Sequence, residues 1–194
     1  MFNKLNQFIV SCSKSWWKFL LLVAGQTGTM FVLMNITQKF PSVTAGYEPF
    51  DMQNSLAAAE VFTQLESYTP EAFRLYSIFQ AVDYLFPLFA GLVLATAGAF
   101  ALRHASPSIY TRFANSKLLA WPLIPTVFDW LENINLLWAV SAWPERVDLA
   151  ATLAVASKVC KLTSMYCVFA IVGILLVWAT TRWLTRRLSP TDQA

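Results

Sequence analysis

Four stretches of this chain are long and apolar enough to cross a lipid bilayer, and this pattern constrains the fold more than any other feature. A hydrocarbon core of about 30 Å needs about 20 helical residues, because lipid offers no partner to an unpaired backbone group. The predicted spans cover residues 19–37, 75–102, 118–143 and 162–181, and the only charged side chains within them are Asp83, Asp129 and Glu132. We therefore expect an all-α integral membrane protein, a four-transmembrane-helix bundle in a single domain over residues 1–194.

Composition agrees with this interpretation and excludes several classes of protein. Hydrophobic residues make up 57% of the chain and charged residues only 13%, about half the usual share for a soluble domain. The net charge of +3 is small and its Lys and Arg are scattered, so no nucleic-acid partner is expected. The three cysteines lack CxxC spacing, and neither an HExxH motif nor a Gly-rich phosphate loop occurs. No metal and no cofactor are predicted.

The distribution of basic residues predicts the orientation, because cytoplasmic flanks retain Lys and Arg. With both termini in the cytoplasm, five basic residues lie outside: Lys39, Arg74, Arg146, Lys158 and Lys161. Nine lie inside: Lys4, Lys14, Lys18, Arg103, Arg112, Lys117, Arg182, Arg186 and Arg187. Because no retrieval tail or lipidation signal is apparent, we expect a multi-pass protein of the cell (inner) membrane of a bacterium.

Three shorter helices are expected outside the four spans. Residues 2–17 repeat apolar side chains every three or four positions, which predicts an interfacial helix on the inner leaflet or an extension of the first span. The outer loop 38–73 should be partly helical and fold as a lid with a short capped helix after Asn54, and the helix of the second span should begin at Thr69-Pro70-Glu71. A further short helix is expected along the outer surface from Arg146 to Cys160.

Two polar stripes mark the candidate site inside the membrane. At 100° per residue, Tyr76, Gln80, Asp83 and Pro87 share one face of the second span, and Asp129, Glu132 and Asn133 share one face of the third. An ionisable side chain at membrane depth costs roughly 2.5–3.5 kcal/mol, so both stripes should point into the bundle and meet in its outer half. Pro122 and Pro125 should kink or open the third helix just below.

The charges available at this depth limit how many of the three carboxyl groups can be ionised. No Lys, Arg or His lies within the four spans at that depth, so three unpaired carboxylates cannot all be ionised. At least one should carry a proton at neutral pH, unless a cation is bound or the outer-rim Lys158 or Lys161 reaches in.

Several functions fit these residues, and the sequence leaves them open. The first prediction is a small membrane protein that binds a lipid or another hydrophobic ligand, or that acts as a scaffold or accessory subunit. Proton- or cation-coupled transport is an alternative, and so is a lipid- or isoprenoid-modifying enzyme that uses a buried carboxyl as general acid or base. Polar residues that only hold the helices together are a plainer explanation. The candidate ligand- or proton-binding residues are Asp83, Asp129, Glu132, Asn133, Gln80 and Tyr76, with Tyr84, Phe128 and Trp130 as further lining.

The expected partners follow from the membrane setting. They are membrane lipids, a hydrophobic small molecule, and other membrane subunits or a second copy of the chain. No catalytic residue can be named.

The segment Asp83-Tyr84-Leu85-Phe86-Pro87, with its acid before Phe-Pro in the second span, resembles the EXPERA-type membrane proteins, which include sterol isomerases. The resemblance covers these few residues and the number of spans. It implies a four-span bundle with buried carboxyls. The membrane histidine of the isomerases has no counterpart, because the sole histidine, His104, lies in the predicted inner loop.

Overall fold

The computed structural model describes residues 2–188, and this part of the chain is helical throughout and contains no strand. The order of its elements is α1 (Phe2–Ser13), α2 (Trp16–Lys39), η1 (Phe40–Val43), η2 (Phe50–Met52), α3 (Ala58–Leu65), α4 (Pro70–Asp83), α5 (Phe86–Ala105), α6 (Pro107–Asn115), η3 (Leu118–Leu123), α7 (Ile124–Ala142) and α8 (Asp148–Leu188).

Three helical segments are long and apolar enough to span a membrane. They are Trp16–Val43, Pro70–Ala105 and Asp148–Leu188. The 19 residues of α7 correspond to the third predicted span and include Asp129, Glu132 and Asn133, which lower its mean hydropathy. An all-helical membrane protein is thus supported.

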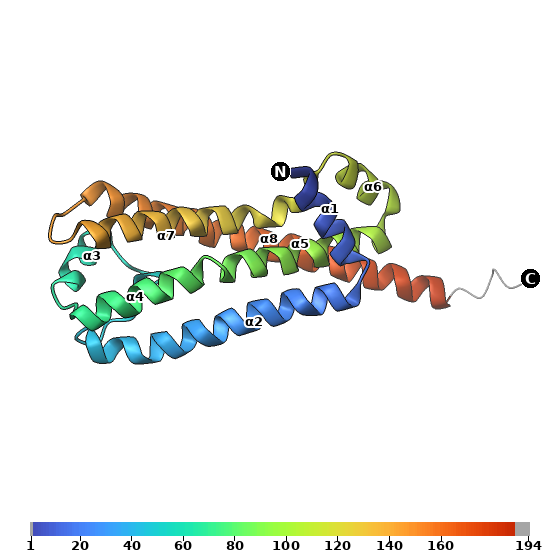
Figure 1. The fold of residues 1–194 in the computed structure, drawn as a ribbon. Helices are drawn as coiled ribbons and strands as arrows, with labels where there is room; N and C mark the ends of the chain where they lie inside the picture. Colours follow the sequence, from blue (N-terminus) through green and yellow to red (C-terminus); the bar gives the residue numbers. More distant parts are fainter. Residues whose placement is uncertain (1, 189–194) are drawn as a thin grey trace, which may run out of the picture.

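The long helices lie side by side in an elongated bundle (Figure 1). The most extensive contacts join α7 to α8, followed by α5 to α8 and α2 to α5. At one end, residues 40–69 with η1, η2 and α3 cover the bundle; we call this the lid end. At the other, called the α1 end, α1 and α6 pack beside η3 and α5.

The second predicted span is not one continuous helix, which corrects the expectation for 75–102. α4 ends at Asp83 and α5 begins at Phe86, because Pro87 has no N–H to donate to the carbonyl of Asp83 and its ring clashes with that carbonyl in a continuous helix. Two backbone carbonyls at the break are bound from α7: Trp130 Nε1 donates to Tyr84 O at 2.9 Å and Thr126 Oγ1 to Pro87 O at 2.7 Å. The break is therefore held by side chains of the neighbouring helix.

A glycine beside this break allows the close approach of α5 and α7. A Cβ added to Gly91 would lie 2.5 Å from Thr126 Oγ1 and 2.8 Å from Leu123 Cδ2. The smallest residue is thus required where the two helices meet.

The prolines of the third span act differently from the prediction. Pro122 lies within η3 and Pro125 in the first turn of α7, where its missing N–H would have no intrahelical partner in any case. The third span therefore begins with a short 3-10 helix that leads into α7, and the two prolines do not kink α7 itself.

The separate surface helix expected from Arg146 to Cys160 is wrong. α8 runs unbroken for 41 residues, about 62 Å, which is twice the thickness of a hydrocarbon core. No Pro or Gly interrupts residues 148–172, and in the bundle Lys158 is buried and Lys161 largely covered, instead of both lying on its outer surface.

The lid has a hydrophobic core of its own. Phe40, Phe50, Tyr68 and Tyr76 pack ring against ring, with centroids 5.5–6.4 Å apart. The predicted partly helical loop is confirmed, and so is the helix start at Thr69, whose hydroxyl accepts a hydrogen bond from Ala72 N.

The N-terminal segment forms a helix separate from the first span. α1 ends at Ser13, and Ser15 adopts an extended conformation before α2 begins. Ile9 and Cys12 are buried against α5 and η3, and Asn6 Nδ2 donates to Ala114 O at 2.9 Å. An extension of the first span is therefore excluded, and α1 packs against the bundle.

Candidate functional site

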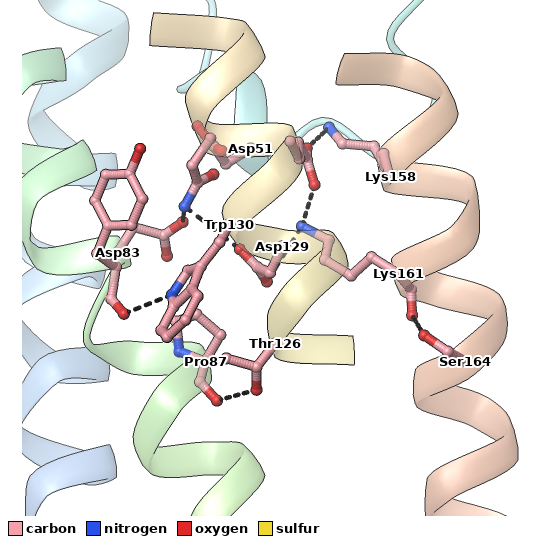
Figure 2. Close-up of polar contacts among 12 residues, drawn as sticks. Asp51, Asp83, Pro87, Thr126, Asp129, Trp130, Lys158, Lys161 and Ser164 are labelled. Atoms are coloured by element: carbon pink, nitrogen blue, oxygen red, sulfur yellow. Dashed lines mark hydrogen bonds and ion pairs between the residues drawn. The ribbon is translucent and has the colours of Figure 1, made fainter. Parts of the chain in front are cut away.

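Ionisable side chains from four segments meet below the lid (Figure 2). We call this group the carboxylate cluster: Asp51 from η2, Asp83 from α4, Asp129 and Glu132 from α7, and Lys158 and Lys161 from α8. Glu132 is fully buried, and Lys158 and Asp83 are 4% and 7% exposed. Charged groups at such depth need partners in the protein.

The amide of Asn133 joins two of the acids. Its Nδ2 donates to Asp83 Oδ2 at 2.8 Å and to Asp129 Oδ1 at 3.4 Å. Glu132 lies one turn from Asp129 and shares a lysine with it. The predicted meeting of the second- and third-span stripes is therefore observed.

The two lysines of α8 supply the positive charge. Lys161 Nζ lies 2.5 Å from Glu132 Oε2 and 3.5 Å from Asp129 Oδ2, and Lys158 Nζ lies 3.0 Å from Glu132 Oε1. Both were predicted at the outer rim, with their reaching into the cluster as an open alternative, and this alternative is what the structure shows. Their i, i+3 spacing places both on one face of an unbroken helix, and that spacing is the signal in the sequence.

Asp51 was not predicted as part of the site. Tyr76 Oη and Gln80 Nε2 donate to Asp51 Oδ2 at 3.0 and 2.8 Å, so part of the polar stripe of α4 binds a loop residue. Lys158 Nζ donates to the carbonyls of Phe50 and Gln53, on either side of Asp51, at 2.7 and 2.8 Å. Nothing in the sequence distinguishes Asp51 from the other acids of its loop.

Burial raises the pKa of Asp51 to about 7, and the nearby carboxylates of Asp83 and Glu132 act in the same direction. Lys161 and Lys158 oppose this shift without cancelling it. Asp51 lies in the lid, where its carboxyl Oδ1 is shielded from solvent. This group therefore changes its protonation near neutral pH.

The cluster contains more acceptors than donors. Four carboxyl groups face two lysines, so the fully ionised cluster would carry two net negative charges. Three buried oxygens at the site have no hydrogen-bond partner: Oδ1 of Asp51 itself, and the amide oxygens Gln80 Oε1 and Asn133 Oδ1. An unpartnered buried polar atom typically costs about 1–3 kcal/mol, so the arrangement favours an added proton or another donor.

The remaining predicted residues divide into two groups. Tyr76, Gln80 and Pro87 are buried on the inner face of their helices as expected, but Tyr76 packs its ring within the lid core. Tyr166, within the predicted fourth span, is 66% exposed. Trp130 is bound to the backbone at the α4–α5 break, so its indole braces that break.

No family model matches the sequence, and no curated protein or solved structure is similar to it. The chemistry of the cluster is therefore inferred from its geometry. Buried carboxyls that outnumber their cations, joined by an amide and closed by lysines, can hold and exchange a proton.

Proposed function

We propose that α2, α4–α5, α7 and α8 each cross the bilayer of the cell membrane, with the α1 end in the cytoplasm. In α7, the polar residues that lower its hydropathy bind α4 and α8, so their cost in lipid is reduced. The burial of Lys158 and Lys161 leaves Lys39, Arg74 and Arg146 as the exposed basic residues of the lid end, against nine at the other. This asymmetry supports the orientation.

We further propose that the protein binds and releases protons at the carboxylate cluster, as the coupling site of a proton-driven membrane transporter. The observation that carries this proposal is the deficit of donors: two lysines serve four carboxyl groups, and three buried oxygens of the site, one of them on Asp51, lack a hydrogen-bond partner. A proton on one carboxyl removes a buried negative charge and turns an acceptor into a donor.

A proton fits the cluster better than a metal ion or a hydrophobic ligand. The ammonium groups of Lys158 and Lys161 already lie between the carboxylates, where a bound cation would otherwise sit. The aromatic ring of Tyr76, expected to line a lipid pocket, packs against Phe50 and Phe79. These contacts therefore favour the binding and release of a proton over the binding of a bulky ligand.

The position of the cluster also supports a role in transport. Asp83 ends α4 at a break in a helix that we place in the membrane, and discontinuous helices often form the ion and substrate sites of transporters. The cluster contacts the lid through Asp51 and Lys158, which connects it to the lid-end surface.

Infrared difference spectroscopy tests the proton-binding step without a known substrate. Between about pH 5 and pH 9, the wild type should lose the C=O band of a protonated carboxylic acid, and Asp83→Asn and Asp129→Asn should each alter that band. Asp148→Asn is the matched control, because that carboxylate is 79% exposed. A wild-type spectrum without a carboxylic-acid band, or one unchanged in both cluster variants, would contradict the proposal.

Proteoliposomes test the transport step. With an internal pH dye and an imposed potassium diffusion potential, candidate solutes are added from outside. A solute-dependent pH change that Asp129→Asn abolishes and Asp148→Asn retains is the expected result. If the infrared bands respond but no solute in a broad panel moves protons, the cluster acts as a pH sensor and the transporter assignment is wrong.

A further inference from the structure

The α1 end contains a cavity that neither the cluster nor the lid explains. Its volume is about 540 Å³, within the range of about 300–1,000 Å³ typical of ligand sites. It lies where the corner between α1 and α2 meets α5 and α8, and its walls include Phe19, Ala97, Phe100 and Leu176. It is far along the bundle from the carboxylate cluster, and its lining is mainly apolar.

The rim of this cavity is basic. Lys14 and Arg103 line it, and no acidic residue does so among its described lining residues. Ser15, at the N-cap position of α2, makes no side-chain capping hydrogen bond, so the first-turn N–H groups of α2 have no side-chain partner there. A helix N-terminus flanked by two cations attracts an anion.

A buried hydroxyl inside the cavity also lacks a partner. Thr96 is 2% exposed and lines the cavity, and its Oγ1 makes no hydrogen bond. Within a helix this hydroxyl could bind the backbone one turn earlier, as Thr180 does with Leu176 O in α8. The free hydroxyl is thus available to a polar group of an occupant that otherwise contacts apolar walls.

We propose that this cavity binds a phospholipid with an anionic headgroup. One acyl chain lies along Phe100 and Leu176, the ester region lies near Thr96, and the phosphate lies at the N-terminus of α2 between Lys14 and Arg103. Trp16, 74% exposed at the cavity rim, lies at the interfacial level that tryptophan prefers in membranes. The proposal is independent of proton binding and rests only on the placement of the bundle in a bilayer.

Native mass spectrometry tests this binding with two probes of matched acyl chains, phosphatidylglycerol and phosphatidylcholine. The wild type should retain phosphatidylglycerol in preference. The double variant Lys14→Gln/Arg103→Gln should weaken that retention roughly tenfold to thirtyfold, because each basic residue near anionic lipid contributes about 1 kcal/mol. Arg112→Gln, an exposed basic residue on α6 that does not line the cavity, should leave it unchanged.

A second variant separates the cavity from general attraction of lipid to the surface. Ala97→Phe places a ring in the cavity and should reduce retention of both lipids, while the melting temperature in detergent shows that the bundle is intact. The double variant changes only rim charges, so it remains a valid test if Ala97→Phe fails to fold. Equal retention of the two lipids by the wild type, or unchanged retention in the double variant, would overturn the proposal.

Discussion

The two ends of this bundle are held together by different interactions. At the lid end, Asn133 and the lysines of α8 bind carboxylates of α4 and α7, beneath a core of aromatic rings. At the α1 end, the helices pack through small side chains: Ala101, Ala105 and Ala179 form one buried cluster, and a Cβ at Gly98 would contact Val172 at 3.6 Å. The lid end is thus held by charged groups, and the α1 end by close packing of small side chains.

This difference shows how a small membrane protein can separate a responsive region from a fixed one. Close packing of small residues is the usual means of joining helices in lipid, where burial of apolar surface adds little, and it does not depend on pH. Buried ion pairs are costly to form and costly to break, so they hold the lid end only while the charge pattern is complete.

The largest loss of stability is expected when a cation is removed from the lid end. Lys161→Met leaves Asp129 without a lysine and Glu132 with Lys158 alone, and should lower the free energy of unfolding by about 3–5 kcal/mol. Chemical unfolding in detergent measures this. Arg146→Met is the control, because the 4.0 Å pair of Arg146 with Asp148 is exposed and should cost less than about 1 kcal/mol.

A double-mutant cycle sharpens this result. Adding Asp129→Asn to Lys161→Met neutralises the acid that Lys161→Met leaves without a cation, and should restore part of the lost stability. If Lys161→Met is as stable as Arg146→Met, the ion pairs do not hold the lid end and the contrast fails.

The pH dependence of stability should be concentrated at the lid end. The pKa of Asp51 is raised to about 7, so between about pH 4 and pH 7 the folded state holds a proton that the unfolded state has lost. Stability from this group is therefore present at low pH and is lost as pH rises through 7. Asp51→Asn should reduce the fall in the free energy of unfolding between about pH 5 and pH 8 by about 2 kcal/mol, because neighbouring groups share part of the full shift.

The groups that face Asp51 define the controls for this experiment. Tyr68, Tyr76 and Gln80 lie on one side, and Asp83, Glu132 and both cluster lysines act on it. Asp148→Asn, on the exposed side of the same end, should leave the pH profile unchanged. Parallel profiles for wild type and Asp51→Asn would show that Asp51 does not titrate in this range.

The smallest effect on stability is expected at the close contact of Gly91 with the neighbouring helix. Gly91→Ala forces its new methyl group against Thr126 and Leu123, and should cost about 1–2 kcal/mol at every pH. Gly173→Ala is the matched control, because a Cβ there meets nothing within 4 Å. Thermal melting at two pH values measures both variants. A cost for Gly91→Ala that changes with pH would show that the two kinds of interaction are not separate.

The sequence predicted the polar stripes better than the shapes of the helices. The spacing of Tyr76, Gln80 and Asp83 placed them on one buried face, and the spacing of Asp129, Glu132 and Asn133 did the same. Helical periodicity is local, so it could be read directly. The break at Tyr84 follows from Pro87, and the continuous α8 from a run without Pro or Gly over residues 148–172, so both had local signals that the division into spans overlooked.

The partners of the carboxylates were harder to predict from the sequence. Lys158 and Lys161 were placed at the outer rim because a surface helix was expected before the fourth span, and their contact with the acids was only one of the alternatives left open. Asp51 joins the site only because the lid folds back on α4, bringing together residues 25 to 29 positions apart. Long-range closure of that kind leaves no periodic trace in the sequence.

The unbroken helix α8 connects the two ends of the bundle. Lys161 in the carboxylate cluster and Leu176 in the wall of the cavity at the α1 end lie on one rigid rod, about 22 Å apart along its axis. Because no Pro or Gly lies between these two residues except Gly173, a change in the direction of α8 at the carboxylate cluster would also shift the wall of the cavity.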